Sequence, residues 1–189
     1  MTTARGRAKA SRREALLTAA ARLFAERGYP GTSIEELGAA AGVSGPALYK
    51  HFSGKQAMLA AILLEASEGL HSGGRDVLSR ATGADALRAL VAFHVEFALD
   101  NADVIRVQDR DLGQLAEDDR HTVRTLQRLY VEAWVEVLAG LNPDADRAVL
   151  RTRAHAVFGL LNSTPHSGLD LDRATLRREL ERMALAALA

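Results

Sequence analysis

The stretch from Ala39 to Met58, which reads AAAGVSGPALYKHFSGKQAM, constrains the fold of this chain more than any other part of the sequence. It contains Gly42, Gly45, Pro46 and Gly54, which are poor helix formers, yet helical periodicity runs up to it and away from it. We therefore expect helices that break at short intervals. Two short helices joined by a tight, glycine-containing turn are typical of helix-turn-helix units, in which the second helix projects from the body.

The first of these two helices, which is the second helix of the chain, has a defined start and end in the sequence. It begins at a capping box formed either by Thr32 and Glu35 or by Ser33 and Glu36. We expect it to stop at Gly42, because glycine readily takes the left-handed conformation that ends helices.

The third and fourth helices are expected to follow at once. Ser44 can cap a third helix that runs only through Phe52. Ser53 and Gln56 predict a capping box for a long fourth helix. The glycine-containing segment 71–74 (HSGG) is its expected end or kink.

The remaining sequence predicts further helices and no alternating strand. We expect an all-α protein with a DNA-binding unit at residues 1–55 and a larger helical body at residues 56–189, where effector binding and dimerisation take place. The chain has 189 residues and no cysteine, which excludes disulfides and thiolate sites. No apolar run is long enough to span a bilayer, so we expect a soluble cytoplasmic protein.

The net charge of zero conceals an asymmetry between these two parts. Residues 1–55 contain nine Lys and Arg residues against four Asp and Glu residues, so the rest of the chain is acidic. A basic head on an acidic body suggests that the head meets a polyanion. A solvated basic tail explains the same charge equally well.

The third helix has the surface that a DNA groove requires. Leu48 and Phe52, four residues apart, are expected to face the core. The other positions are small, aromatic or basic and are expected to face outward: Ala47, Tyr49, Lys50 and His51. Small residues allow close approach to the major groove, while the longer side chains reach phosphates and base edges. An ordinary corner between two helices, with a solvated face, is the alternative that these residues leave open.

Residues 12–59 resemble the DNA-binding domain of the TetR family of bacterial transcriptional regulators. The matching segment is LLTAAARLFAERGYPGTSIEELGAAAGVSGPALYKHFSGKQAML. The family's spacing is kept at Phe24, Gly28, Thr32, Ala41–Ser44, Leu48, Tyr49, His51, Phe52, Lys55 and Leu59. The resemblance implies about nine helices, of which three bind DNA and the others bind a ligand and form a dimer.

The expected DNA contacts combine this resemblance with the free N–H groups at helix starts. They are Thr32, Ser33, Ser44, Gly45, Pro46, Ala47, Tyr49, Lys50, His51 and Lys55. One departure matters, because Gly45 stands where many family members carry Lys or Arg. Lys50 is then the best candidate for reading guanine. The basic arm from Arg5 to Arg13 is expected to enter the minor groove or to add phosphate contacts.

The end of the chain is expected to form a homodimer through residues 148–188. Val149–Ser163 is apolar on two faces, and together with Arg173–Leu188 it would leave apolar surface bare in a monomer. The resemblance implies that these two helices pack against their copies, and we expect Phe158 and Leu180 in the seam. Burial of both faces within one chain is the alternative.

The body is expected to contain a small-molecule effector cavity. His94 and Phe97 lie on one apolar helix face, and Trp134, Phe158 and Asn162 lie on other body helices. Polar groups set in apolar walls are typical of ligand cavities, although a lone histidine on an apolar stripe is more often a core residue. The stretches QRLYVEAWVEVL and AHAVFGLLNSTPHS resemble those of TetR-like regulators associated with lipid catabolism, and this resemblance suggests an acyl-CoA or another amphiphile as the effector.

An enzyme is the main rival class, and its motifs are missing from the sequence. The six histidines are scattered, and there is no metal-binding histidine pair, phosphate loop or nucleophile elbow. We therefore expect no catalytic residues, no metal and no cofactor. A helical adaptor without a DNA role would not explain the basic head. The sequence predicts a ligand-responsive transcriptional repressor that binds a palindromic operator as a dimer and is released by a small, largely apolar effector.

Overall fold

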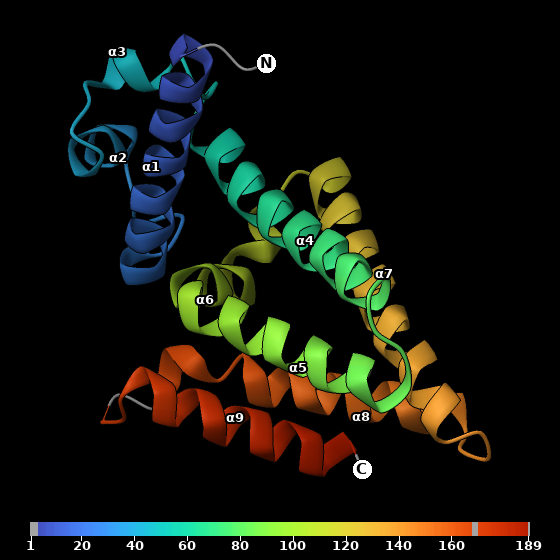
Figure 1. Ribbon diagram of the computed structural model, residues 1–189. Coiled ribbons are helices and arrows are strands. Elements are labelled where there is room, and N and C mark those ends of the chain that lie inside the picture. Colours follow the sequence, from blue (N-terminus) through green and yellow to red (C-terminus); the bar gives the residue numbers. More distant parts are fainter. Residues whose placement is uncertain (1–3, 168–169, 189) are drawn as a thin grey trace.

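The computed structural model describes residues 4–167 and 170–188, with side chains from residue 11 onward (Figure 1). Within these ranges every regular element is a helix, which confirms the predicted all-α fold. The α-helices are α1 (Ala4–Arg27), α2 (Ile34–Ala40), α3 (Gly45–Leu48), α4 (Lys55–Leu78), α5 (Gly83–Asp100), α6 (Ala102–Asp111), α7 (Glu117–Leu141), α8 (Arg147–Leu161) and α9 (Arg173–Leu188). Two 3₁₀ turns, η1 (Leu112–Gln114) and η2 (Thr164–His166), follow α6 and α8. None of the described helices is long and apolar enough to cross a membrane.

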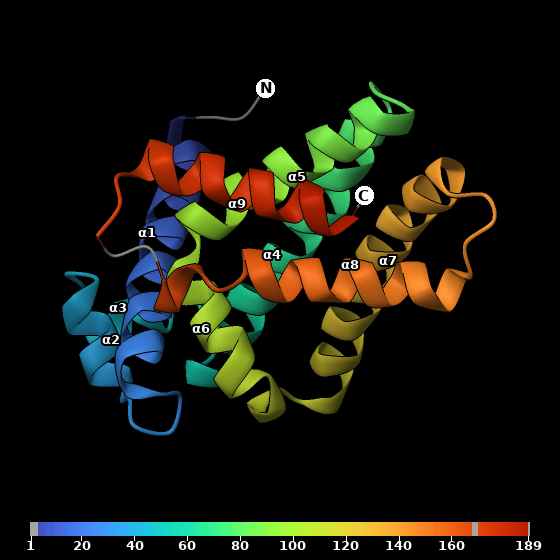
Figure 2. The same cartoon turned by 90° about the horizontal axis from the view of Figure 1, so that it is seen from below.

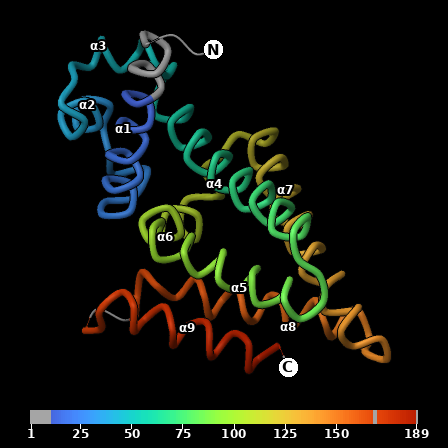
Figure 3. Tube along the Cα trace, viewed as in Figure 1, coloured from blue at the N-terminus to red at the C-terminus, as the bar shows by residue number. Residues whose placement is uncertain are grey.

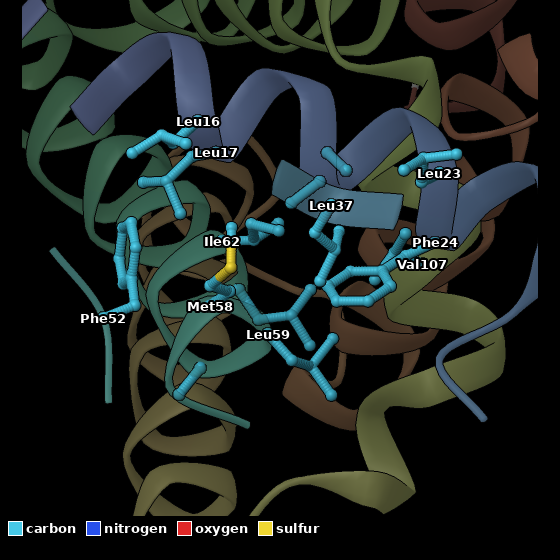
Figure 4. Packing of buried hydrophobic residues seen from close by; sticks show 14 of the residues in the cluster. Leu16, Leu17, Leu23, Phe24, Leu37, Phe52, Met58, Leu59, Ile62 and Val107 are labelled. Carbon is cyan, nitrogen blue, oxygen red and sulfur yellow. The ribbon is translucent and has the colours of Figure 1, made fainter. Parts of the chain in front are cut away.

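The first hydrophobic core lies under α1, α2 and α3 and includes the start of α4 (Figure 4). Phe24, Leu48 and Leu59 are fully buried in it. The body also contributes to this core, because Val107 of α6 and Val123 of α7 belong to the same cluster. Helix α4 therefore joins the two parts of the molecule, and the division between residues 55 and 56 stays a prediction.

The second core lies among α5, α7, α8 and α9, with the later half of α4 packed against it. Trp134 and Leu138 of α7 are fully buried there, as are Leu150 and Val157 of α8. Figures 1 and 2 show α8 and α9 side by side along the edge of the body remote from α2 and α3.

Helix α4 does not end or break its hydrogen bonding at segment 71–74, so the predicted end there is wrong. The helix continues to Leu78, and its glycines make room for side chains of the body. A Cβ atom on Gly74 would lie 2.6 Å from a ring carbon of Tyr130, and one on Gly73 would overlap the ring of Phe93. These glycines allow close packing between helices.

The capping predictions have mixed outcomes. At the start of α2 the box is formed by Ser33 and Glu36, in which the Glu36 N–H donates to the Ser33 hydroxyl at 3.2 Å and the Ser33 N–H to the Glu36 carboxylate at 2.8 Å. The predicted box of Ser53 and Gln56 is wrong. Gly54 occupies the N-cap position of α4, and no side chain caps that end.

Candidate DNA-binding surface and effector cavity

The α2–α3 turn is built by close backbone approach. Gly42 takes a φ of 67° after the end of α2, and the Val43 N–H donates to the Gly38 carbonyl at 2.9 Å. A Cβ atom on Gly38 would lie 2.9 Å from the Val43 carbonyl oxygen, so only glycine fits without movement. This turn fixes the direction in which α3 projects from the head.

Helix α3 presents the expected side chains to solvent. Leu48 and Phe52 are buried in the first core, as predicted, while Tyr49 is 56% exposed. Lys50 is also exposed. The helix is shorter than expected, since it ends at Leu48 and continues only as turns to His51. Ser44, Gly45, Pro46 and Ala47 form its start, and the Ser44 hydroxyl does not cap the helix.

Two residues expected at the DNA interface instead hold the loop between α1 and α2. Thr32 is only 2% exposed, and its hydroxyl donates to the Gly28 carbonyl at 2.9 Å. The Lys55 ammonium donates to the carbonyls of Tyr29 and Thr32 at 2.8 and 2.9 Å and lies 4.4 Å from the Tyr29 ring centre. Thr32 is therefore buried, and the links of Thr32 and Lys55 to DNA stay predictions.

A set of hydrogen bonds joins the loop between α1 and α2 to the body. We call it the head–body clamp, and its side chains come from Gln56, Arg110 and Asp111. The Asp111 carboxylate accepts a hydrogen bond from the Tyr29 N–H at 3.3 Å, and the Arg110 guanidinium donates to main-chain carbonyls at the end of α1. Gln56 accepts from the Tyr29 hydroxyl at 2.6 Å and donates to the Gln114 carbonyl at 2.8 Å. Figure 3 shows α6 beside the C-terminal end of α1. Sequence reasoning missed this clamp because its partners lie far apart in the chain.

The basic arm continues α1 as a helix from Ala4. Arg13 pairs with Glu65 of α4, and its guanidinium lies 5.3 Å from the ring centre of Phe52. The side chains of Arg5, Arg7 and Lys9 lie outside the described residues. Contacts between this arm and DNA stay a prediction.

A cavity of about 190 Å³ lies in the body between α4, α5, α6, α7 and α8. Three predicted residues line it, namely His94, Phe158 and Asn162. The other two do not line it, and their contact with an effector stays a prediction. Phe97 lines a separate crevice of about 330 Å³ between α1, α4, α5 and α6, and Trp134 is fully buried behind the wall, 4.9 Å from Phe158 between ring centres.

His94 organises the wall of this cavity. One ring nitrogen, Nε2, lies 3.1 Å from the Asn162 Oδ1, and the other, Nδ1, lies 3.3 Å from the Tyr130 hydroxyl. Because an amide oxygen only accepts, Nε2 carries the proton and Nδ1 accepts from Tyr130. Burial lowers the pKa of His94 to about 4, so the ring is neutral at pH 7. Its ring is stacked with that of Phe158 at 5.0 Å between centres.

The outer faces of α8 and α9 are partly apolar and open to solvent. Val149 is 49% exposed and Met183 37%, whereas Leu150, Ala154, Val157 and Leu161 on the opposite face of α8 are buried in the second core. The expected seam residues are wrong, because Leu180 is 2% exposed inside the chain and Phe158 lines the cavity. Helix α8 thus has one apolar face buried in the chain and apolar residues such as Val149 on a face open to solvent, as expected.

Comparisons with known proteins agree with this architecture. Residues 16–62 match the model of bacterial regulatory proteins of the tetR family, and residues 80–166 match the tetracyclin repressor-like C-terminal domain. The HTH-type transcriptional repressor KstR2 of Rhodococcus jostii (strain RHA1) is 32% identical over 145 residues, which cover 74% of this chain and 70% of that protein. The HTH-type transcriptional activator FasR of Mycolicibacterium smegmatis is 40% identical over 87 residues, which cover 46% of this chain and 40% of that protein.

Solved structures give the same fold. A TetR-family transcriptional regulator from Bordetella parapertussis 12822 superposes with a TM-score of 0.81 at 26% identity, covering 92% of this chain and 93% of that chain. AibR, solved in complex with isovaleryl coenzyme A and operator DNA, has a TM-score of 0.74 at 22% identity, covering 91% and 97%.

Proposed function

Because the chain belongs to the TetR family of bacterial transcriptional regulators, we propose that it represses transcription by binding a palindromic operator as a homodimer, and that a small effector releases it. Proteins of this family are DNA-binding regulators rather than enzymes. The observation that carries the proposal is the α3 surface, on which Tyr49 and Lys50 are exposed while Leu48 anchors the helix in the first core.

In this proposal α3 enters the major groove. The small residues Gly45, Pro46 and Ala47 allow the helix backbone to approach the base edges, and Lys50 reads guanine. Tyr49 and His51 contact phosphates, as do the exposed Ser33 and Ser44 near the starts of α2 and α3. Thr32 and Lys55 act behind this surface, because their hydrogen bonds fix the loop that precedes α2.

The homodimer is proposed to form through residues 148–188. Apolar side chains such as Val149 and Met183 stay exposed on one chain, and a second copy would cover them. A two-fold axis at this seam would place two α3 helices against major grooves about 34–36 Å apart, which explains why the operator is expected to be palindromic.

The effector is proposed to occupy the cavity beside His94, Phe158 and Asn162. Its walls combine aromatic rings with neutral polar groups, which suits a largely apolar ligand with few hydrogen-bonding atoms. An acyl-CoA or another amphiphile is the candidate class. Release of DNA requires that this ligand bind more tightly to a dimer whose heads no longer fit the grooves.

DNA reading is tested by gel shift of the full chain on DNA from upstream of its own gene. Lys50→Ala should weaken operator binding about 5–150-fold, corresponding to ~1–3 kcal/mol for a base contact, and should reduce the preference over random DNA. Arg22→Ala is the matched control, because Arg22 is an exposed cation on α1, outside the α2–α3 unit. An unchanged ratio of operator to random-DNA affinity in Lys50→Ala would show that Lys50 does not read sequence.

Dimer formation is tested by sedimentation equilibrium at micromolar protein. Val149→Asp and Met183→Asp should give monomers, because each places a charge in the proposed apolar seam. Leu129→Asp is the control, since Leu129 is 43% exposed on α7. A wild-type chain that sediments as a monomer would refute the dimer.

A further inference from the structure

The effector cavity adjoins a second hollow on the outer surface of α7 and α8. This hollow, which we call the arginine hollow, is lined by Arg124, Arg128 and Arg151. The cavity and the arginine hollow share three lining residues, namely Gln127, Val131 and His155. The two hollows are therefore adjacent and share part of their lining.

We infer that the two hollows form one binding site for an acyl derivative with a phosphorylated head group. The acyl chain lies in the inner cavity, and the head group lies on Arg124 and Arg128 at the surface. This inference rests on the proposed effector function and adds to it the place of each part of the ligand.

The charge of the arginine hollow supports an anionic head group. Arg124 and Arg128 are exposed and make no ion pair or hydrogen bond with the residues that the structure describes. One carboxylate lines the hollow, that of Glu132, and it is already bound by Arg151 at 2.8 Å and by Arg147 at 3.6 Å. Arg124 and Arg128 are four residues apart and so project from the same side of α7. Arginine forks suit phosphate oxygens.

The inner cavity has the opposite character and excludes the charged part of a ligand. No Asp, Glu, Lys or Arg side chain lines it in the described part of the chain, and His94 is neutral. A carboxylate placed there would lose its hydration without gaining a cation. A water molecule's share of liquid volume is about 30 Å³, so a cavity of about 190 Å³ has room for about six groups of that size, such as a short acyl chain.

Gln127 stands where the two hollows meet. Its amide nitrogen, Nε2, is buried and has no hydrogen-bond partner among the described residues. Buried polar atoms are normally paired, and an unpaired one is costly. A carbonyl oxygen between the acyl chain and the head group would be at the right place to accept from Nε2. Gln127 would thereby distinguish an acyl derivative from a plain hydrocarbon.

The test compares three probes, which are hexanoyl-CoA, free CoA and sodium hexanoate, on the full chain. Binding is measured by calorimetry and by the fluorescence of Trp134, the only tryptophan in the chain. Hexanoyl-CoA should bind at least tenfold more tightly than either CoA or hexanoate, because only it occupies both hollows. Its affinity should fall as salt rises, since the head group is held by charge.

Variants locate the two parts of the ligand. The double variant Arg124→Ala and Arg128→Ala should bind hexanoyl-CoA at least tenfold more weakly, while Arg80→Ala with Arg88→Ala, which removes two exposed arginines elsewhere, should bind as the wild type does. Gln127→Leu should weaken hexanoyl-CoA binding several-fold and leave CoA binding unchanged.

Several outcomes would overturn the inference. They are equal affinity of the wild type for hexanoate and hexanoyl-CoA, equal affinity for CoA and hexanoyl-CoA, no binding of any probe, or undiminished binding by the double arginine variant. A gel shift separates this inference from the proposed function. If hexanoyl-CoA binds as expected but leaves operator affinity unchanged, the two-part site stands and the release mechanism fails.

Discussion

Replacing Gly74 by alanine should destabilise the protein, although alanine is the better helix former. Gly74 is buried within α4, and a Cβ atom there would lie 2.6 Å from one ring carbon of Tyr130 and 3.0 Å from another. Tyr130 is itself only 4% exposed and packs against the rings of His94 and Phe158. The added methyl group therefore has to displace a packed aromatic ring.

The magnitude follows from a comparison within the same helix. Gly69 is exposed on α4 and would place no atom within 4 Å of an added Cβ. Gly69→Ala should stabilise the protein by up to about 1 kcal/mol, the usual difference in helix propensity. Gly74→Ala gains the same amount but also carries an overpacking cost of ~1–3 kcal/mol. The two variants should therefore differ by ~1–3 kcal/mol.

Thermal unfolding of both variants at one protein concentration measures this difference. For a chain of this size, 1 kcal/mol corresponds to about 2–4 °C, so Gly74→Ala should melt about 2–12 °C below Gly69→Ala. Trp134 fluorescence should also change in Gly74→Ala, because Trp134 lies edge-on to Tyr130 at 6.1 Å between ring centres. A melting temperature for Gly74→Ala as high as that for Gly69→Ala would refute the packing argument.

Three further predictions concern buried or half-buried polar groups, and each is checked by urea unfolding. Burial lowers the pKa of His94 to about 4 in the folded chain, against 6.5 in the unfolded chain, so the unfolded chain binds the proton first as the pH falls. The free energy of unfolding should therefore drop by about 3 kcal/mol between pH 6.5 and 4. A His94→Gln variant should lack this part of the pH dependence. Lys55→Met should lose ~1–2 kcal/mol with two hydrogen bonds to main-chain carbonyls, whereas Lys50→Met, at an exposed position, should lose less than ~0.5 kcal/mol. Asp111→Asn should lower the free energy of unfolding by ~1–3 kcal/mol, because the buried carboxylate accepts from the Tyr29 N–H and pairs with Arg110. An equal loss in Asp85→Asn, at an exposed position, would argue against a special role for the clamp.

The parts of the structure that depend on neighbouring residues could be predicted from the sequence. A capping box at the start of α2 and the burial of Leu48 and Phe52 follow from spacings of three and four residues, although the sequence left open whether Thr32 or Ser33 forms the box. The stop at Gly42 follows from the left-handed conformation that glycine readily takes. Such spacings decide which backbone groups and which helix faces meet. The helix-turn-helix unit and its exposed α3 were predictable for this reason.

The features that could not be predicted depend on contacts between distant segments. Gly73 and Gly74 look like a helix end in the sequence. In the structure, Phe93 packs where a side chain at Gly73 would lie, and Tyr130 packs where one at Gly74 would lie. Thr32 looks like a free hydroxyl at a helix start, and the structure buries it against the Gly28 carbonyl.

The cavity was predictable in part. An apolar stripe identifies which helix face is buried, so His94 could be placed inside the body. It does not show which buried side chains border a void and which are packed on all sides. Trp134 is of the second kind, whereas Gln127, a half-buried polar residue of α7 outside the apolar stripe, borders the void.

The first core has a consequence for how proteins of this type can be recombined. Val107, Leu115 and Val123, all from the body, complete a core whose other buried members lie within residues 16–63. A head transplanted onto an unrelated body at residue 62 would leave Phe24 and Leu59 facing partners of the wrong shape. Exchange of the head alone should therefore cost stability, whereas substitutions at the exposed positions of α3 leave this shared core undisturbed.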